Sequence, residues 1–87
     1  MNSFKGKIFL ELANYIDSSD KTYLKNIYEL CEKEIDFSNY SGIINRALPN
    51  IKLYQIIDTA NVLTFPDYDK SNIAILASRV KNLMDQE

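Results

Sequence analysis

The sequence predicts an all-α fold, an antiparallel up-down-up-down bundle of four helices. Apolar residues recur at steps of three and four along most of the chain, which is the period of an amphipathic helix. The chain has only two Gly and two Pro, too few for the turns that many short strands would need. Its 87 residues support one hydrophobic core, so we expect a single domain over residues 1–87.

The first predicted helix spans roughly residues 3–16. Its apolar positions share one face: Phe4, Ile8, Leu12, Tyr15 and Ile16. Lys5 and Lys7 before a short apolar run faintly resemble a signal peptide, but the run stops at Glu11 and no small-residue cleavage site follows. We therefore expect this segment to belong to the mature protein. No run of 18 apolar residues occurs, so we expect no membrane span.

The second predicted helix covers residues 20–35. Ser18 and Ser19 each offer an N-cap hydroxyl, and Asp20 then places a negative charge in the first turn, where the helix dipole favours it. The apolar face consists of Leu24, Ile27, Tyr28, Cys31 and Ile35. Cys31 is the only cysteine, so we predict a small core side chain in a reducing compartment.

The third predicted helix runs from about residue 40 to 63, with Asp36 or Ser38 as its cap. Its apolar steps continue on both sides of Pro49: Tyr40, Ile43, Ile44, Ala47 and Leu48, then Ile51, Tyr54, Ile57, Ala60 and Leu63. A proline inside a helix removes a hydrogen bond and clashes with the preceding turn. The alternatives are one kinked helix or two helices that meet at Leu48. We favour the kink, because no cluster of loop residues separates the halves.

The stretch TFPD predicts the start of the fourth helix. Thr64 would cap it, Pro66 suits a first turn that needs no N–H, and Asp67 would reach back to the cap. The helix then carries its apolar residues on one side: Ile73, Leu76, Ala77, Val80, Leu83 and Met84. Part of the spacing resembles a calcium loop, but Asn72 and Ser78 occupy the positions that require Gly and a bidentate Glu, so we predict no metal site.

The composition argues against catalysis and against nucleic-acid binding. The chain has no His, no Gly-rich phosphate loop and no partner that would activate its cysteine, so we predict no enzyme activity, no catalytic residue and no cofactor. The formal net charge of −2 provides no basic field for a nucleic-acid backbone. Four of the tyrosines are expected in the core or at its edge rather than on a base-stacking surface: Tyr15, Tyr28, Tyr40 and Tyr54.

Two apolar residues are expected to be exposed. If the fourth helix buries the side centred between Ile73 and Leu76, the opposite side carries Ile75 among small polar residues. The same construction places Leu10 on the outer side of the first helix. Single exposed apolar residues are ordinary on protein surfaces, but on a polar face they are also positions where a partner docks.

The segment YSGIINRALPNIKLYQIIDTANVLTFPDYDKSNIAILASRV resembles the enterocin A-type immunity proteins of pediocin-like bacteriocins. The likeness lies in the LY pair that begins at Leu53, the LTFP turn that begins at Leu63 and the I-x-x-L spacing from Ile73. It covers most of residues 8–84 as an arrangement of elements and about 40–66 as recognisable motifs.

This resemblance implies a cytoplasmic four-helix bundle without chemistry, which gives resistance to an antimicrobial peptide. Such proteins are thought to protect the cell from the inside by engaging the mannose phosphotransferase permease that the bacteriocin uses as its receptor. The resemblance thus implies a protein partner at the inner face of the cell membrane and at most a peripheral association with the membrane. It places partner-binding residues on the outward side of the fourth helix: Lys70, Ser71, Ile75, Ser78, Arg79 and Asn82.

A small helical regulator or antitoxin that sequesters a protein partner is the alternative function. The same bundle with exposed Ile75 and Leu10 would serve it equally well. A helix-turn-helix DNA-binding protein would need a basic recognition helix, whereas the cations Lys70, Arg79 and Lys81 of the fourth helix are cancelled by three aspartates.

Overall fold

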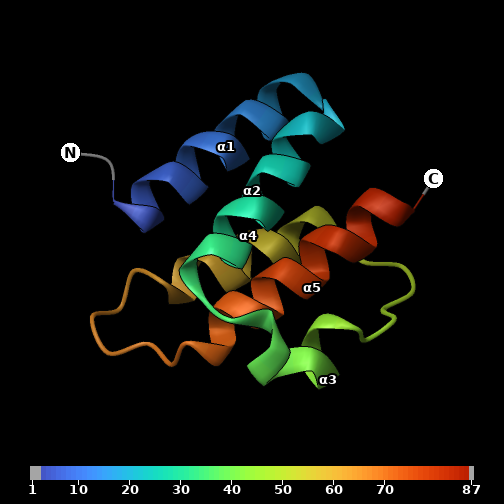
Figure 1. Cartoon of the computed structure of the whole chain (residues 1–87). Helices are drawn as coiled ribbons and strands as arrows, with labels where there is room; N and C mark the ends of the chain where they lie inside the picture. Colours follow the sequence, from blue (N-terminus) through green and yellow to red (C-terminus); the bar gives the residue numbers. More distant parts are fainter. Residues whose placement is uncertain (1–2, 87) are drawn as a thin grey trace.

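Five α-helices and one 3-10 turn follow one another in the computed structural model, which describes residues 3–86 (Figure 1). In chain order they are α1 (Phe4–Ser18), α2 (Lys21–Glu34), η1 (Phe37–Tyr40), α3 (Ser41–Ile44), α4 (Leu53–Val62) and α5 (Ser71–Asp85). Every regular element of the described residues is helical, so the predicted all-α class is confirmed.

The first two helices form from the amphipathic segments that the sequence indicates. The Ser3 hydroxyl caps α1, and the Asp20 carboxylate caps α2 by accepting a hydrogen bond from the Thr22 N–H at 2.9 Å. The prediction of Ser18 or Ser19 as the cap of α2 is wrong. Ser19 instead ends α1 in a left-handed conformation with φ of 58°, so the second helix begins one residue later.

The predicted third helix over residues 40–63 is wrong in its first half. After η1 and α3 the structure has a linker over residues 45–52, and α4 begins at Leu53. Pro49 lies in a turn of this linker and therefore does not kink a helix. The alternative of two helices meeting at Leu48 is also wrong, because the linker separates them. A proline disfavours helical backbone in the residue before it, which fits the irregular backbone at Leu48.

The linker keeps a helix-like apolar pattern because it also contributes to the core. Ile51 is buried, and Leu48 packs against the buried cluster. Asn50 adopts a left-handed conformation with φ of 61°, which Asn tolerates better than most residues. Apolar spacing alone therefore does not separate this linker from a helix.

The TFPD stretch does not start the last helix. α4 ends at Val62, a turn segment follows over residues 63–70, and α5 begins at Ser71. The Thr64 hydroxyl donates to the carbonyl of Asn61 at 2.7 Å, so it completes α4 rather than capping α5. The side chain at the start of α5 is that of Asp69, which accepts a hydrogen bond from the Ser71 N–H at 2.9 Å.

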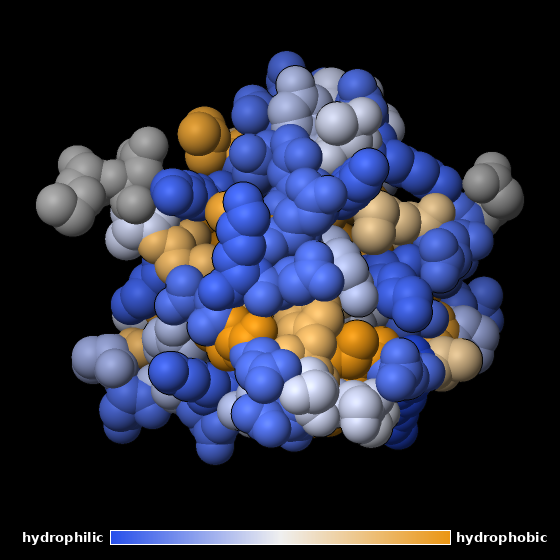
Figure 2. Space-filling view, in the orientation of Figure 1, coloured by the Kyte–Doolittle hydropathy of each residue, from blue (hydrophilic) through white to orange (hydrophobic). Residues whose placement is uncertain are grey.

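α5 is the central helix of the molecule. It packs against α2, α3, α4 and η1, whereas α1 packs mainly on α2. Its buried residues are Ile73, Ala74, Leu76, Ala77, Ser78 and Val80. These residues lie on more than one side of the helix, so α5 is covered by several neighbouring elements at once. Figure 2 shows hydrophilic residues over most of the visible face and a row of apolar residues across its lower half, in the region of α5 and α3 in Figure 1.

Candidate functional site

The described residues contain neither a metal cluster nor a membrane-spanning helix. Within residues 3–86 no group of three or more His, Cys, Asp or Glu side chains lies close enough to hold a metal ion. In the same part of the chain, each helix is too short or too polar to cross a bilayer. Binding sites for ligands and partner side chains are commonly surface hollows.

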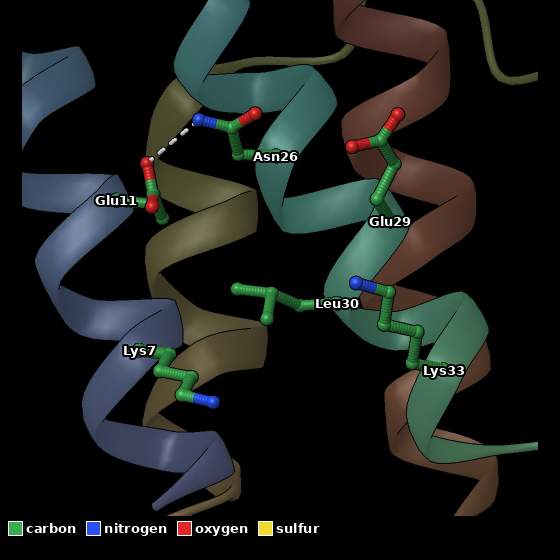
Figure 3. A pocket seen from close by; sticks show the side chains of 6 residues that line it. All are labelled: Lys7, Glu11, Asn26, Glu29, Leu30 and Lys33. Atoms are coloured by element: carbon green, nitrogen blue, oxygen red, sulfur yellow. Dashed lines mark hydrogen bonds between the residues drawn. The ribbon is translucent and has the colours of Figure 1, made fainter. Parts of the chain in front are cut away.

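One hollow of about 210 Å³ lies between α1 and α2 (Figure 3). Its lining consists of Lys7, Glu11, Asn26, Glu29, Leu30 and Lys33. The Asn26 amide donates to the Glu11 carboxylate at 3.1 Å and so joins the two helices, and Leu30 points from α2 toward α1. Two cations face two carboxylates around one leucine, so this hollow has no preference for a charged ligand of either sign.

Two further hollows lie on either side of one face of α5, and both are lined by Ile75 and Arg79. The α4–α5 hollow has a volume of about 200 Å³ and is lined by Asp58, Thr59, Val62, Asn72, Ile75 and Arg79. The α3–α5 hollow has a volume of about 250 Å³ and is lined by Ile43, Arg46, Leu48, Ile75, Ser78 and Arg79. We call Ile75, Arg79 and these two hollows the α5 face.

Arg79 is held in place by α4. Its Nη1 donates to the carbonyl of Gln55 at 3.3 Å and to the Thr59 hydroxyl, which in turn donates to the same carbonyl at 2.7 Å. A guanidinium has five N–H donors, and among the described residues only Nη1 makes hydrogen bonds. Arg79 therefore keeps donors for a further acceptor while its position is fixed.

Ser78 does not face solvent as predicted. It is only 2% exposed, because α5 is covered on more than one side. Its hydroxyl oxygen is the one buried side-chain polar atom within residues 3–86 that has no hydrogen-bond partner. A buried hydroxyl without a partner is unfavourable, and this one belongs to a residue that lines the α3–α5 hollow.

Asn82 binds the linker rather than pointing into solvent. Its side-chain oxygen accepts from the Leu48 N–H at 2.9 Å, and its nitrogen donates to the carbonyls of Arg46 at 3.0 Å and Ser78 at 2.7 Å. One turn later, the Gln86 amide accepts from the Ile51 N–H at 2.6 Å and donates to the Ile51 carbonyl at 3.0 Å. Asn82 in α5 thus holds the linker backbone at Arg46 and Leu48, which line the α3–α5 hollow, and Gln86 just after α5 holds the linker further on.

The other predicted partner-binding residues lie apart from this arrangement. Lys70 is exposed and Ser71 is half-buried at the start of α5, and neither lines the two hollows. Ile75 is half-buried rather than exposed, because α3 and α4 both pack against α5 beside it. The structure thus brings together Ile75, Ser78 and Arg79 of the predicted set and adds Arg46, which the sequence pattern did not single out.

Several apolar residues are exposed outside the α5 face. Leu10 is 58% exposed, as predicted, whereas Ile16 and Tyr54, predicted on buried faces, are 53% and 63% exposed. Ile16 lies in the last turn of α1, and in Figure 1 this end of the helix points away from α4 and α5. Tyr54 lies in the first turn of α4, about 200° around the helix from the buried Ile56.

Cys31 is a core residue, as predicted. Its side chain is buried, and burial raises the pKa of the thiol to about 12, with a smaller contribution from the charge of Glu34. The thiolate is the reactive form of cysteine, so the folded protein keeps this thiol inert.

Comparison of the chain with protein-family models, with curated proteins and with solved structures found no match. The resemblance to enterocin A-type immunity proteins therefore rests on the sequence motifs that begin at Leu53, Leu63 and Ile73.

Proposed function

We propose that this chain is a bacteriocin immunity protein. It protects a cell from a pediocin-like bacteriocin by binding the membrane receptor complex of that bacteriocin from the cytosolic side. The proposed partner is the mannose phosphotransferase permease with bound bacteriocin, and the proposed location is the cytoplasm at the inner face of the cell membrane. The resemblance of the segment from Leu53 through the LTFP turn supports this assignment.

The helix order is compatible with the proposed architecture. The four longer helices α1, α2, α4 and α5 would form the antiparallel four-helix bundle, with η1, α3 and the linker inserted between its second and third members. This topology is part of the proposal, as is the absence of chemistry and of a cofactor.

The observation that carries the proposal is the α5 face. Binding energy at protein interfaces concentrates in a few apolar and arginine side chains that are set in pockets. Ile75 and Arg79 have this character, because each lies between two hollows and Arg79 is held in place by α4. The face lies on α5, the helix on which the resemblance places the partner-binding residues.

A protection assay tests the proposal. The chain is expressed in a pediocin-sensitive bacterium, which is then challenged with a panel of pediocin-like peptides. We expect survival against one or a few peptides and no survival with an empty vector. A Leu76→Asp variant is the unfolded control, because it places an unpaired charge at a fully buried position. Killing by every peptide, with the wild-type protein folded and abundant, would refute the immunity function.

The alternative is a small helical regulator or antitoxin that sequesters a protein partner. The exposed Leu10, Ile16, Tyr54 and Phe65 favour it, because they lie outside the α5 face and would give a partner other apolar contacts. Co-expression with an intracellular toxin separates the two functions: an antitoxin restores growth, whereas an immunity protein does not.

A further inference from the structure

The α3–α5 hollow differs from the other hollows in charge. Its lining includes the two cations Arg46 and Arg79 and no carboxylate. The hollow between α1 and α2 has Glu11 and Glu29 in its lining, and the α4–α5 hollow has Asp58. A further hollow between the linker and the end of α5 is lined by Asp85. In a chain with a formal net charge of −2, the α3–α5 hollow is thus a local site for an anionic group.

The hollow also has an apolar part. Ile43, Leu48 and Ile75 contribute to its lining, and its volume is about 250 Å³. An engineered apolar cavity of about 150 Å³ accommodates benzene. The α3–α5 hollow therefore has room for one large aliphatic or aromatic side chain.

Hydrogen-bond donors remain unused around this space. Arg46 is exposed, and its guanidinium has no hydrogen-bond or ion-pair partner among the described residues. Arg79 uses only Nη1, and the Ser78 hydroxyl has no partner. A guanidinium binds a carboxylate with paired, charge-assisted hydrogen bonds, which neutral acceptors do not match.

We infer that the α3–α5 hollow binds a segment of a protein partner in which a large apolar side chain lies directly beside a carboxylate. The apolar side chain enters between Ile43, Leu48 and Ile75, and the carboxylate accepts hydrogen bonds from Arg46 and Arg79. The Asn82 amide fixes the wall of the hollow before binding, which lowers the entropic cost of association. The inference rests on the proposed function only in taking the partner to be a protein.

N-acetyl-leucine is a minimal probe for this chemistry, because it joins one aliphatic side chain to one carboxylate. N-acetyl-leucinamide is the matched neutral probe. For a ligand of this size we expect a Kd on the order of 1 mM. Titration of the isotope-labelled full chain by NMR should shift the amide signals of Ile43, Leu48 and Ile75, and the neutral probe should bind about fivefold or more weakly. No shift with either probe, equal affinity for both, or shifts gathered on another surface would overturn the inference.

Two variants with the same change of charge locate the anion site. Arg46→Gln removes a cation from the α3–α5 hollow, and Lys33→Gln removes one from the hollow between α1 and α2. Both side chains are exposed, so both variants are expected to fold. Arg46→Gln should abolish the preference for N-acetyl-leucine over its amide, and Lys33→Gln should retain it. An equal preference in both variants would overturn the assignment of the carboxylate to Arg46.

The protection assay keeps this inference separate from the proposed function. If N-acetyl-leucine binds in the hollow but the chain does not protect cells, the binding role of the α3–α5 hollow is supported and the immunity function is refuted. If the chain protects cells but does not bind the probe, the binding role of the α3–α5 hollow is refuted and the immunity function is supported.

Discussion

Ser78 combines a small side chain with an unfavourable position. As a fully enclosed residue of α5, it permits close packing of the neighbouring elements, but its hydroxyl loses water without gaining a hydrogen bond. An unsatisfied buried polar group costs about 1–3 kcal/mol. Ser78 belongs to the lining of the α3–α5 hollow, but its hydroxyl oxygen is itself buried.

Replacing Ser78 by Ala should stabilise the free protein by about 1 kcal/mol, since the unsatisfied hydroxyl is removed and little volume is lost. Urea unfolding followed by circular dichroism measures the change. Ser41→Ala is the matched control, because Ser41 is an exposed helical residue whose hydroxyl is not buried. A Ser78→Ala protein less stable than wild type would contradict the structure by showing that the hydroxyl has a partner.

Cys31 makes the stability of the fold sensitive to alkaline pH. The pKa of the thiol is about 12 in the folded chain, mainly because of burial, against an ordinary value of 9.0. Below pH 9 the thiol is neutral in both states, so its contribution is fully present. As the pH rises from 9 toward 12, only the unfolded chain ionises and stability is lost. Burial raises the pKa of the Tyr28 hydroxyl as well, which acts in the same direction.

We expect the wild-type protein to lose on the order of 2 kcal/mol more unfolding free energy between pH 8 and pH 10.5 than a Cys31→Ala variant. Urea unfolding at the two pH values measures both losses, and comparison of the variants removes the effect of the other titrating groups. The same loss in both proteins would show that the thiol ionises as readily in the folded chain as in the unfolded one.

At the scale of elements, three of the starts, those of α2, η1 and α5, depend on aspartates. Asp20, Asp36 and Asp69 each accept hydrogen bonds from the residue two positions later. These hydrogen bonds lower the pKa of all three carboxylates from the ordinary value of 3.8. The stabilisation is therefore present above pH 3.8 and is lost as the pH falls through the lowered values.

The linker depends on α5 for its shape. Asn82 satisfies the Leu48 N–H and the Arg46 carbonyl, and no helix or strand ladder is available to replace these bonds. We expect Asn82→Ala to lower the unfolding free energy by about 1–3 kcal/mol and to speed hydrogen exchange at the Leu48 amide. Asp85→Ala, an exposed change on the same helix, should do neither. Unchanged exchange at Leu48 in Asn82→Ala would contradict the role of the amide.

Pro49 distinguishes a linker from a kinked helix. In a linker, Pro49→Ala increases the freedom of the unfolded chain and should lower stability by up to about 1 kcal/mol without adding helix. In a kinked helix the same change would restore a hydrogen bond and raise both stability and helix content. Thermal unfolding and far-ultraviolet circular dichroism of the variant measure both quantities, and a rise in helix content would contradict the linker.

At the scale of the whole molecule, the helical class follows from sequence but the arrangement does not. The apolar period suffices to predict α1 and α2, because each buries a single face, although the cap predicted for α2 is wrong. It fails at residues 45–52, because a linker that buries Ile51 imitates a helical period. It also fails for α5, since a one-sided pattern does not reveal that other elements cover the remaining sides. The small residues Ala74, Ala77 and Ser78 were the signal of a crowded central helix.

The sequence likewise predicts some residues of the candidate site and misses others. Ile75 follows from the spacing of the last helix, because it lies opposite the most apolar side, whereas Arg79 is expected only from the family resemblance. Arg46 follows from neither, since its place beside them depends on where the linker crosses α5. The role of Asn82 was missed because an amide bonded to a distant backbone has no local sequence signature.

The most direct test is protection of bacteriocin-challenged cells by the wild-type chain, Arg46→Gln and Lys33→Gln, expressed at equal levels. The measured quantity is the bacteriocin concentration that kills half of the cells. We predict that wild type and Lys33→Gln raise this concentration equally, and that Arg46→Gln moves it back toward the empty-vector value. Equal protection by Arg46→Gln and Lys33→Gln would contradict recognition through the α3–α5 hollow, and no protection by wild type would contradict the immunity function itself.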